Sequence, residues 1–136
     1  MLTHTTEEFF PFNILLVEDD ATTAFLETEA LKQLGCKVAH AETAFKAIEI
    51  LNTQTFDLIF VDMTLPDMTG VALTEAIRPM LPETTELVAL TSHSSEQDHD
   101  YFLRHGMMTM LGKPVTYENF KRFFQGYLRV LDCDDE

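Results

Sequence analysis

The stretch DLIFVDMTLPDMTG, residues 57–70, decides the fold of this chain. It begins with the apolar run Leu58–Val61, whose length and polar flanks are those of a strand buried on both faces. The carboxylate of Asp62 follows the run at once, and Pro66 and Gly70 then mark a loop. A buried strand that ends in an acidic residue and a loop is typical of a parallel α/β sheet, whose sites lie at the carboxyl ends of the strands.

Three further apolar runs end in polar residues in the same way. Glu18-Asp19 closes Ile14–Val17, Thr91 closes Leu87–Leu90, and Lys113-Pro114 follows Met108–Gly112. If the four runs are parallel strands of one sheet, all four polar signals meet in one crevice at its carboxyl edge. Three carboxylates, a hydroxyl and an ammonium group in one crevice predict a divalent cation and phosphoryl chemistry.

The rest of the chain alternates between strand-like and helix-like segments. Strands are expected at 13–17, 37–40, 56–61, 87–90 and 108–111, and helices at 21–34, 43–52, 71–81, 96–105 and 116–131. Asp20 is a plausible N-cap for the first helix, and Pro79 should interrupt the third. Five strands that alternate with five helices predict a doubly wound parallel sheet with helices on both faces.

The size and net charge of the chain limit the kinds of molecule that it is expected to bind. The chain has 136 residues, of which 46% are hydrophobic and 24% charged, so one domain with a full core is expected. Nine Lys and Arg residues stand against 23 Asp and Glu residues, for a net charge of -14. This field repels phosphate backbones, so direct nucleic-acid binding is not expected, whereas cations or a basic partner surface are attracted.

Cysteines and hydropathy bear on location. Cys36 and Cys133 have no metal-type spacing, so we expect reduced thiols in a cytoplasmic protein. No apolar run approaches the ~18 residues that a membrane helix needs, and the N-terminus has no basic and apolar regions of a signal peptide. We therefore expect neither export nor membrane contact by this domain.

The ends of the chain differ from its middle. Residues 1–11 are expected to form a flexible segment or linker, with Phe9, Phe10 and Phe12 as candidates for packing against the first strand. Residues 12–131 form the predicted domain. Residues 132–136 form an acidic C-terminal tail, for which fraying is expected.

Four motifs in this order resemble the receiver domain of two-component signalling, the phosphorylatable response-regulator module. They are ILLVEDD (14–20), DLIFVDMTLPDMTG (57–70), LVALTS (87–92) and MLGKP (110–114), and the resemblance covers residues 12–131. It implies a flavodoxin-like (βα)5 fold with strand order 2-1-3-4-5. The RHGM and LGKPV stretches (104–107 and 111–115) are similar to receivers fused to hybrid sensor histidine kinases.

The resemblance assigns roles to the matching residues one by one. Asp62 matches the phosphoryl-acceptor aspartate, which becomes an acyl phosphate. Thr91 matches the hydroxyl residue that contacts the phosphoryl group, and Lys113 matches the lysine that pairs with it. The residues implied as Mg²⁺ ligands are Glu18, Asp19, Asp62 and, through its backbone carbonyl, Thr64. Such a module catalyses its own phosphorylation and dephosphorylation, and it needs positioning and charge neutralisation more than covalent machinery.

The resemblance also implies partners. The phosphoryl donor is a histidine kinase or a histidine phosphotransfer domain, and a downstream protein reads the result. In the family, the first helix and the loop after the lysine often dock the donor's phospho-histidine helix. Leu26, Ala30 and Leu34 lie on one side of that helix and are candidates for this contact, or equally for the core. The chain fits a single-domain regulator, the receiver of a hybrid kinase or a fragment of a larger regulator.

Met110 departs from the family pattern. The family often has an aromatic residue three positions before the lysine, which swings inward when the hydroxyl residue engages the phosphoryl group. Methionine can fill such a pocket but offers no hydroxyl.

An alternative is a degenerate receiver that acts only as a protein-binding module. A haloacid-dehalogenase type of phosphatase would need a second Asp two residues after the nucleophile, where this chain has Thr64.

Overall fold

The computed structural model describes residues 9–92 and 96–134. Residues 1–8, which make up most of the expected flexible segment, lie outside the described residues, as do 93–95 and 135–136. Within the described part of the chain, no helix combines the length and apolar character needed to cross a membrane.

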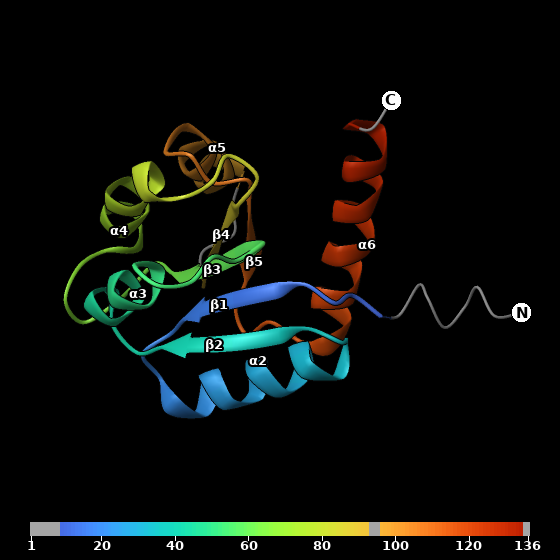
Figure 1. Ribbon diagram of the computed structural model, residues 1–136, viewed down its shortest axis with the longest axis horizontal. Helices are drawn as coiled ribbons and strands as arrows, with labels where there is room; N and C mark the ends of the chain where they lie inside the picture. Colours follow the sequence, from blue (N-terminus) through green and yellow to red (C-terminus); the bar gives the residue numbers. More distant parts are fainter. Residues whose placement is uncertain (1–8, 93–95, 135–136) are drawn as a thin grey trace, which may run out of the picture.

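A parallel sheet of five strands runs through the molecule, with helices between consecutive strands (Figure 1). The strands are β1 Asn13–Val17, β2 Lys37–Ala41, β3 Leu58–Asp62, β4 Glu86–Thr91 and β5 Thr109–Gly112. The helices are α2 Ala21–Gln33, α3 Ala44–Leu51, α4 Gly70–Ile77, α5 Glu96–Arg104 and α6 Tyr117–Asp134. The order β2-β1-β3-β4-β5 confirms the predicted doubly wound fold.

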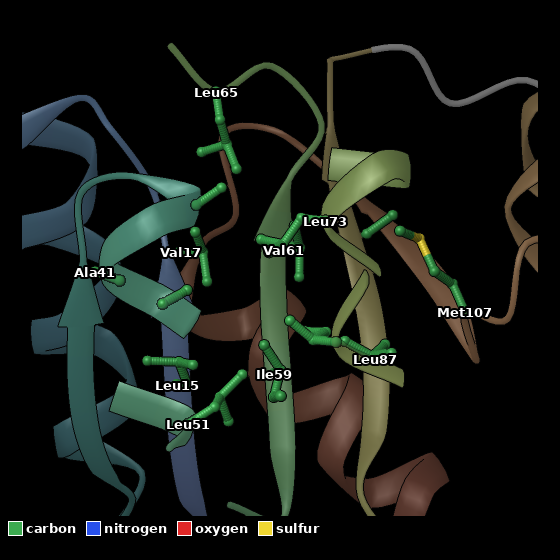
Figure 2. Packing of buried hydrophobic residues seen from close by; sticks show 14 of the residues in the cluster. Leu15, Val17, Ala41, Leu51, Ile59, Val61, Leu65, Leu73, Leu87 and Met107 are labelled. Carbon is green, nitrogen blue, oxygen red and sulfur yellow. The ribbon is translucent and has the colours of Figure 1, made fainter. Parts of the chain in front are cut away.

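Each face of the sheet has its own hydrophobic core, because successive residues of a strand point to opposite faces. Ile59 and Val61 of β3 face α3, α4 and α5, and Figure 2 shows them packed among Leu15, Leu73 and other side chains of that cluster. Residues Leu58 and Phe60 of β3 point the other way, toward α2 and α6. Burial on both faces explains why the strands are continuous apolar runs, since each such side chain contributes about 1.5–3 kcal/mol.

Local sequence signals set the ends of the helices. The Asp20 carboxylate accepts a hydrogen bond from the Thr23 N–H at 2.8 Å and caps α2, as predicted. Thr43 caps α3 in the same way by accepting from the Lys46 N–H at 3.0 Å. The predicted interruption at Pro79 is confirmed, because α4 ends at Ile77 and a short 3-10 turn, η1 Arg78–Met80, follows.

The boundaries of β3 and α6 differ from those expected. Strand β3 begins at Leu58 rather than at residue 56, and it includes Asp62, which pairs with Leu90 of β4. The backbone of Asp62 therefore belongs to the sheet and not to the loop that follows. Helix α6 begins one residue after Thr116, whose hydroxyl accepts from the Asn119 N–H at 3.2 Å as a cap does. The helix extends to Asp134, three residues into the expected tail.

The aromatic residues before β1 pack against α6 on the α2 side of the sheet. The Phe10 ring stacks on Phe124 with 5.3 Å between ring centroids, and the edge of Phe12 meets Tyr127 at 5.3 Å. The Phe10 N–H also donates to the Leu34 carbonyl at 2.7 Å. Phe9, in contrast, is 58% exposed. Two of the three candidate aromatic residues are thus part of the packing, and they contact a helix from the other end of the domain.

Candidate functional site

A cavity of about 430 Å³ opens at the carboxyl ends of the strands. It is bounded by residues that follow or end β1, β3, β4 and β5, as expected where parallel strands terminate together. All six residues predicted for the site line it: Glu18, Asp19, Asp62, Thr64, Thr91 and Lys113. The fold thus brings together side chains that are up to 95 positions apart in the sequence.

Three carboxylates form the acidic part of this cavity. Glu18 and Asp62 are buried, whereas Asp19 is exposed, and each offers an oxygen within 4.8 Å of the other two. Mg²⁺ prefers carboxylate, carbonyl and water oxygens, so this donor set fits that ion. The acidic pocket is consistent with the metal and phosphoryl-acceptor site of a receiver.

Lys113 supplies positive charge at the other side of the cavity. Its Nζ lies 2.9 Å from Glu18 Oε1 and 3.3 Å from Asp62 Oδ2. Burial alone would lower the pKa of Lys113, but the two carboxylates outweigh it and raise the pKa above its usual value. The lysine is therefore protonated over the physiological pH range and offsets part of the negative charge.

The acidic pocket remains crowded with negative charge despite this lysine. Burial is the main reason that the pKa of Glu18 is raised, and the neighbouring Asp62 raises it further. Lys113 opposes the shift, as does the Asp20 N–H, which donates to Glu18 Oε2 at 3.2 Å. A bound cation would relieve this repulsion between buried carboxylates.

Backbone contacts position Thr64 and Thr91. The Thr64 N–H donates to Asp62 Oδ1 at 3.1 Å, so the loop after β3 folds back over the Asp62 carboxylate. Thr91 is buried at the end of β4, and its carbonyl accepts from the Lys113 N–H at 2.8 Å. This hydrogen bond directly joins the end of β4, which carries Thr91, to the end of β5, which Lys113 follows.

Asp67 holds the same loop from outside the cavity. Its two carboxylate oxygens accept from the backbone N–H groups of Ala44 and Phe45, at 3.0 and 2.9 Å, at the start of α3. These two hydrogen bonds lower the pKa of Asp67. Asp67 thus caps α3, which precedes it in the sequence, and not α4, which follows it.

Sequence reasoning missed three residues that α5 adds to the cavity. Asp98, Tyr101 and Phe102 line it beside Thr91. Their positions depend on how α5 packs on the sheet, and no spacing in the sequence points to them. Met110, at the position where the family often has an aromatic residue, is partly buried and packs against the core on the α3–α5 side.

Comparisons with known proteins agree with this arrangement. The sequence model of the response regulator receiver domain matches residues 14–124. Transcription factor SKN7 of Chaetomium thermophilum is 37% identical over 125 residues, which are 90% of this chain and 16% of that protein. The autoinducer 2 sensor kinase/phosphatase LuxQ of Vibrio harveyi is 33% identical over 119 residues, covering 85% of this chain and 14% of that protein.

Solved structures extend the comparison to the fold. A two-component response regulator from Clostridium difficile superposes with a TM-score of 0.77 at 26% identity, over 86% of this chain and 95% of that one. In contrast, the chain spans less than a fifth of the two curated relatives named above. The matched family, the strand order and the acidic pocket agree, and the chain belongs to the response regulator receiver domain family.

Proposed function

We propose that this chain accepts a phosphoryl group onto Asp62 from a phospho-histidine of a partner protein, a histidine kinase or a histidine phosphotransfer domain. The observation that carries the proposal is the position of the Asp62 carboxylate. It shares one small acidic cluster with Glu18 and Asp19, and it lies 3.3 Å from the ammonium group of Lys113. The proposed nucleophile, the proposed metal ligands and the lysine ammonium group thus lie close together at one end of the sheet.

Each residue has a role in the proposed transfer. A carboxylate oxygen of Asp62 attacks the phosphorus, the P–N bond to the donor's imidazole breaks, and the imidazole leaves with the electron pair. Lys113 and the Thr91 hydroxyl contact the phosphoryl oxygens. Mg²⁺, when bound, neutralises carboxylate and phosphoryl charge, and its ligands would be Glu18, Asp19, Asp62 and the Thr64 carbonyl.

Phosphorylation would be read out through the strand ends that carry Thr91 and Lys113. The direct hydrogen bond between their backbones supports this, because a shift of Thr91 toward the phosphoryl group would also move the backbone of Lys113 and the loop after β5. Such a local charge event beside a movable segment is what a protein switch requires. We propose that a downstream protein binds the face made by α5, β5 and α6.

The phosphoryl donor would dock on α2 and the loop after Lys113. Leu26 is 61% exposed and Ala30 partly exposed, which supports a contact there. Leu34 is fully buried against the sheet and belongs to the core, so it is not available to a partner.

The test uses acetyl phosphate, which transfers its phosphoryl group to a carboxylate with release of acetate. Intact mass is measured with MgCl₂ or with EDTA. The matched control is Asp57→Asn, because Asp57 lies just before the opposite end of β3, where its carboxylate accepts from the Asn13 N–H. We expect one phosphoryl adduct in wild type and in Asp57→Asn with Mg²⁺, and none in Asp62→Asn or with EDTA. An equal adduct in Asp62→Asn would refute the assignment, and no adduct in any sample would favour a protein-binding module.

A further inference from the structure

A second cavity, of about 280 Å³, lies between α2 and the segment that follows Lys113. It shares no lining residue with the acidic cavity. Most of its wall is apolar and comes from Leu26, Ala30, Pro114, Val115 and the ring of Tyr117. The opening is on the surface where the proposed function places the phosphoryl donor.

Glu27 is the acidic residue in the wall of this cavity. The residue is only 2% exposed, and neither of its carboxylate oxygens has a hydrogen-bond partner among the described residues. Burial raises the pKa of Glu27 to about 8; the charges of Glu18 and Asp62 add to the shift, whereas Lys113 and the nearby Val115 N–H oppose it. A buried carboxyl group that no described residue satisfies with a well-formed hydrogen bond costs free energy, so a cationic group from another molecule would stabilise it.

The shape and charge of the cavity select the partner group. An alkyl stem suits the apolar wall, and a terminal ammonium group suits the carboxyl group of Glu27. The chain's net charge of -14 attracts a basic surface. Leu26, in the wall of the cavity, is 61% exposed, which suits a partner surface with apolar residues around the basic one.

We infer that this cavity receives a lysine-like side chain from the surface of the phosphoryl-donor protein, and that Glu27 is the residue that pairs with it. The inference rests on the proposed function, because it takes the donor protein as the occupant. Glu27 would then help to decide which donors the chain accepts, since a donor with an apolar or acidic group at that point would leave the carboxyl group unpaired.

Two pairs of probes test the inference by NMR of the whole chain, with Mg²⁺ present so that the cationic probes bind less to the acidic pocket. The first pair is hexylammonium and hexanol. The second pair is an alanine-based helical peptide with a lysine between leucines on one face, and the same peptide with norleucine in place of lysine. Backbone amide shifts of Leu26, Ala30, Val115 and Tyr117 report binding at the cavity. The variant is Glu27→Gln, and the control is Glu29→Gln, which removes an exposed carboxylate from the same helix.

We expect the ammonium member of each pair to bind wild type and Glu29→Gln about tenfold more tightly than the neutral member, a difference of ~1.4 kcal/mol. Glu27→Gln should abolish this preference. Equal binding of charged and neutral probes to wild type would overturn the inference, as would no binding, and both results are independent of whether Glu27→Gln folds. Binding of hexylammonium without the lysine peptide would indicate a small-amine site and overturn the assignment to a protein partner. Labelling of wild type by acetyl phosphate tests the proposed function separately, because it needs no donor protein.

Discussion

At the scale of single residues, the two buried acids Glu18 and Glu27 have different surroundings. Glu18 faces the Lys113 ammonium group at 2.9 Å and shares the acidic pocket with two further carboxylates, so its charge has a cation beside it. Glu27 lies on α2, and neither of its carboxylate oxygens has a hydrogen-bond partner in the part of the chain that the structure describes. The same type of side chain thus has a charged partner in one place and lacks one in the other, and these surroundings set its protonation.

Glu27 should make the stability of the chain fall as pH rises. The pKa of its carboxyl group is about 8 in the folded chain and near its ordinary value of 4.5 when the chain is unfolded. Between these values the unfolded chain has lost the proton that the folded chain retains, so stability is lost progressively from about pH 4.5 to pH 8. We expect Glu27→Gln to be more stable than wild type by about 2–4 kcal/mol at pH 8 and by much less at pH 4. Urea unfolding at several pH values measures this, and a pH-independent difference would contradict it.

Removal of Lys113 should separate metal binding from phosphoryl transfer. In Lys113→Met, the negative charge of Glu18 and Asp62 is no longer offset at 2.9 and 3.3 Å. We therefore expect Mg²⁺ to bind several-fold more tightly by calorimetry, while labelling by acetyl phosphate at saturating Mg²⁺ becomes slower. Lys46→Met is the control, because Lys46 is exposed and pairs with Glu49 at the surface. Weaker Mg²⁺ binding in Lys113→Met would show that the lysine organises the pocket instead of opposing the metal's charge.

At the scale of elements, two helices depend on residues from elsewhere in the fold. Helix α3 begins at Ala44 after the N-cap Thr43, and Asp67 from the loop after β3 accepts hydrogen bonds from its first two N–H groups. Helix α6 in turn packs against Phe10 and Phe12, which precede β1. These contacts join a loop and the N-terminal segment to helices that are distant in sequence. Loss of either contact should therefore destabilise more than one element.

Loss of the Asp67 cap should weaken α3 and loosen the loop that carries Thr64. Asp67→Ala leaves two backbone N–H groups at the helix start without these acceptors, and such caps contribute about 0.5–2 kcal/mol. We expect a loss of about 1 kcal/mol in urea unfolding and weaker Mg²⁺ binding. Glu42→Ala, an exposed acid just before the helix, is the control and should change neither quantity appreciably. A loss of stability with unchanged Mg²⁺ binding would show that the loop holds its position without Asp67.

Truncation of Phe10 tests the packing of the N-terminal segment on α6. Phe10 is 1% exposed and stacks on Phe124, so Phe10→Ala should cost about 3–5 kcal/mol of stability. Phe25→Ala removes the same ring from a position that is 63% exposed and should cost far less. Equal effects of the two substitutions in urea unfolding would mean that the segment before β1 contributes little to the core.

At the scale of the whole molecule, the sequence patterns predicted the candidate site well where its residues lie at the ends of strands. Asp62, Thr91 and Lys113 could be placed in one crevice because parallel strands end at the same edge of a sheet. The two-sided burial of the strands was also visible as continuous apolar runs. The cap that Asp67 places on α3, the residues that α5 adds to the cavity and the burial of Glu27 could not be predicted. These features depend on how the helices pack against the sheet. The spacing of residues along a helix shows which of them share a face, but it does not show whether that face is turned to the core or to solvent.

The measurement that tests the central claim most directly is the identification of the phosphorylated atom. Wild type labelled by acetyl phosphate in Mg²⁺ is treated with borohydride, which reduces an aspartyl phosphate to homoserine with release of phosphate. The peptide that contains residues 57–70 is then sequenced by mass spectrometry. We predict homoserine at position 62 alone, dependent on both acetyl phosphate and Mg²⁺. Homoserine at position 19, or an adduct that borohydride does not reduce, would contradict the account.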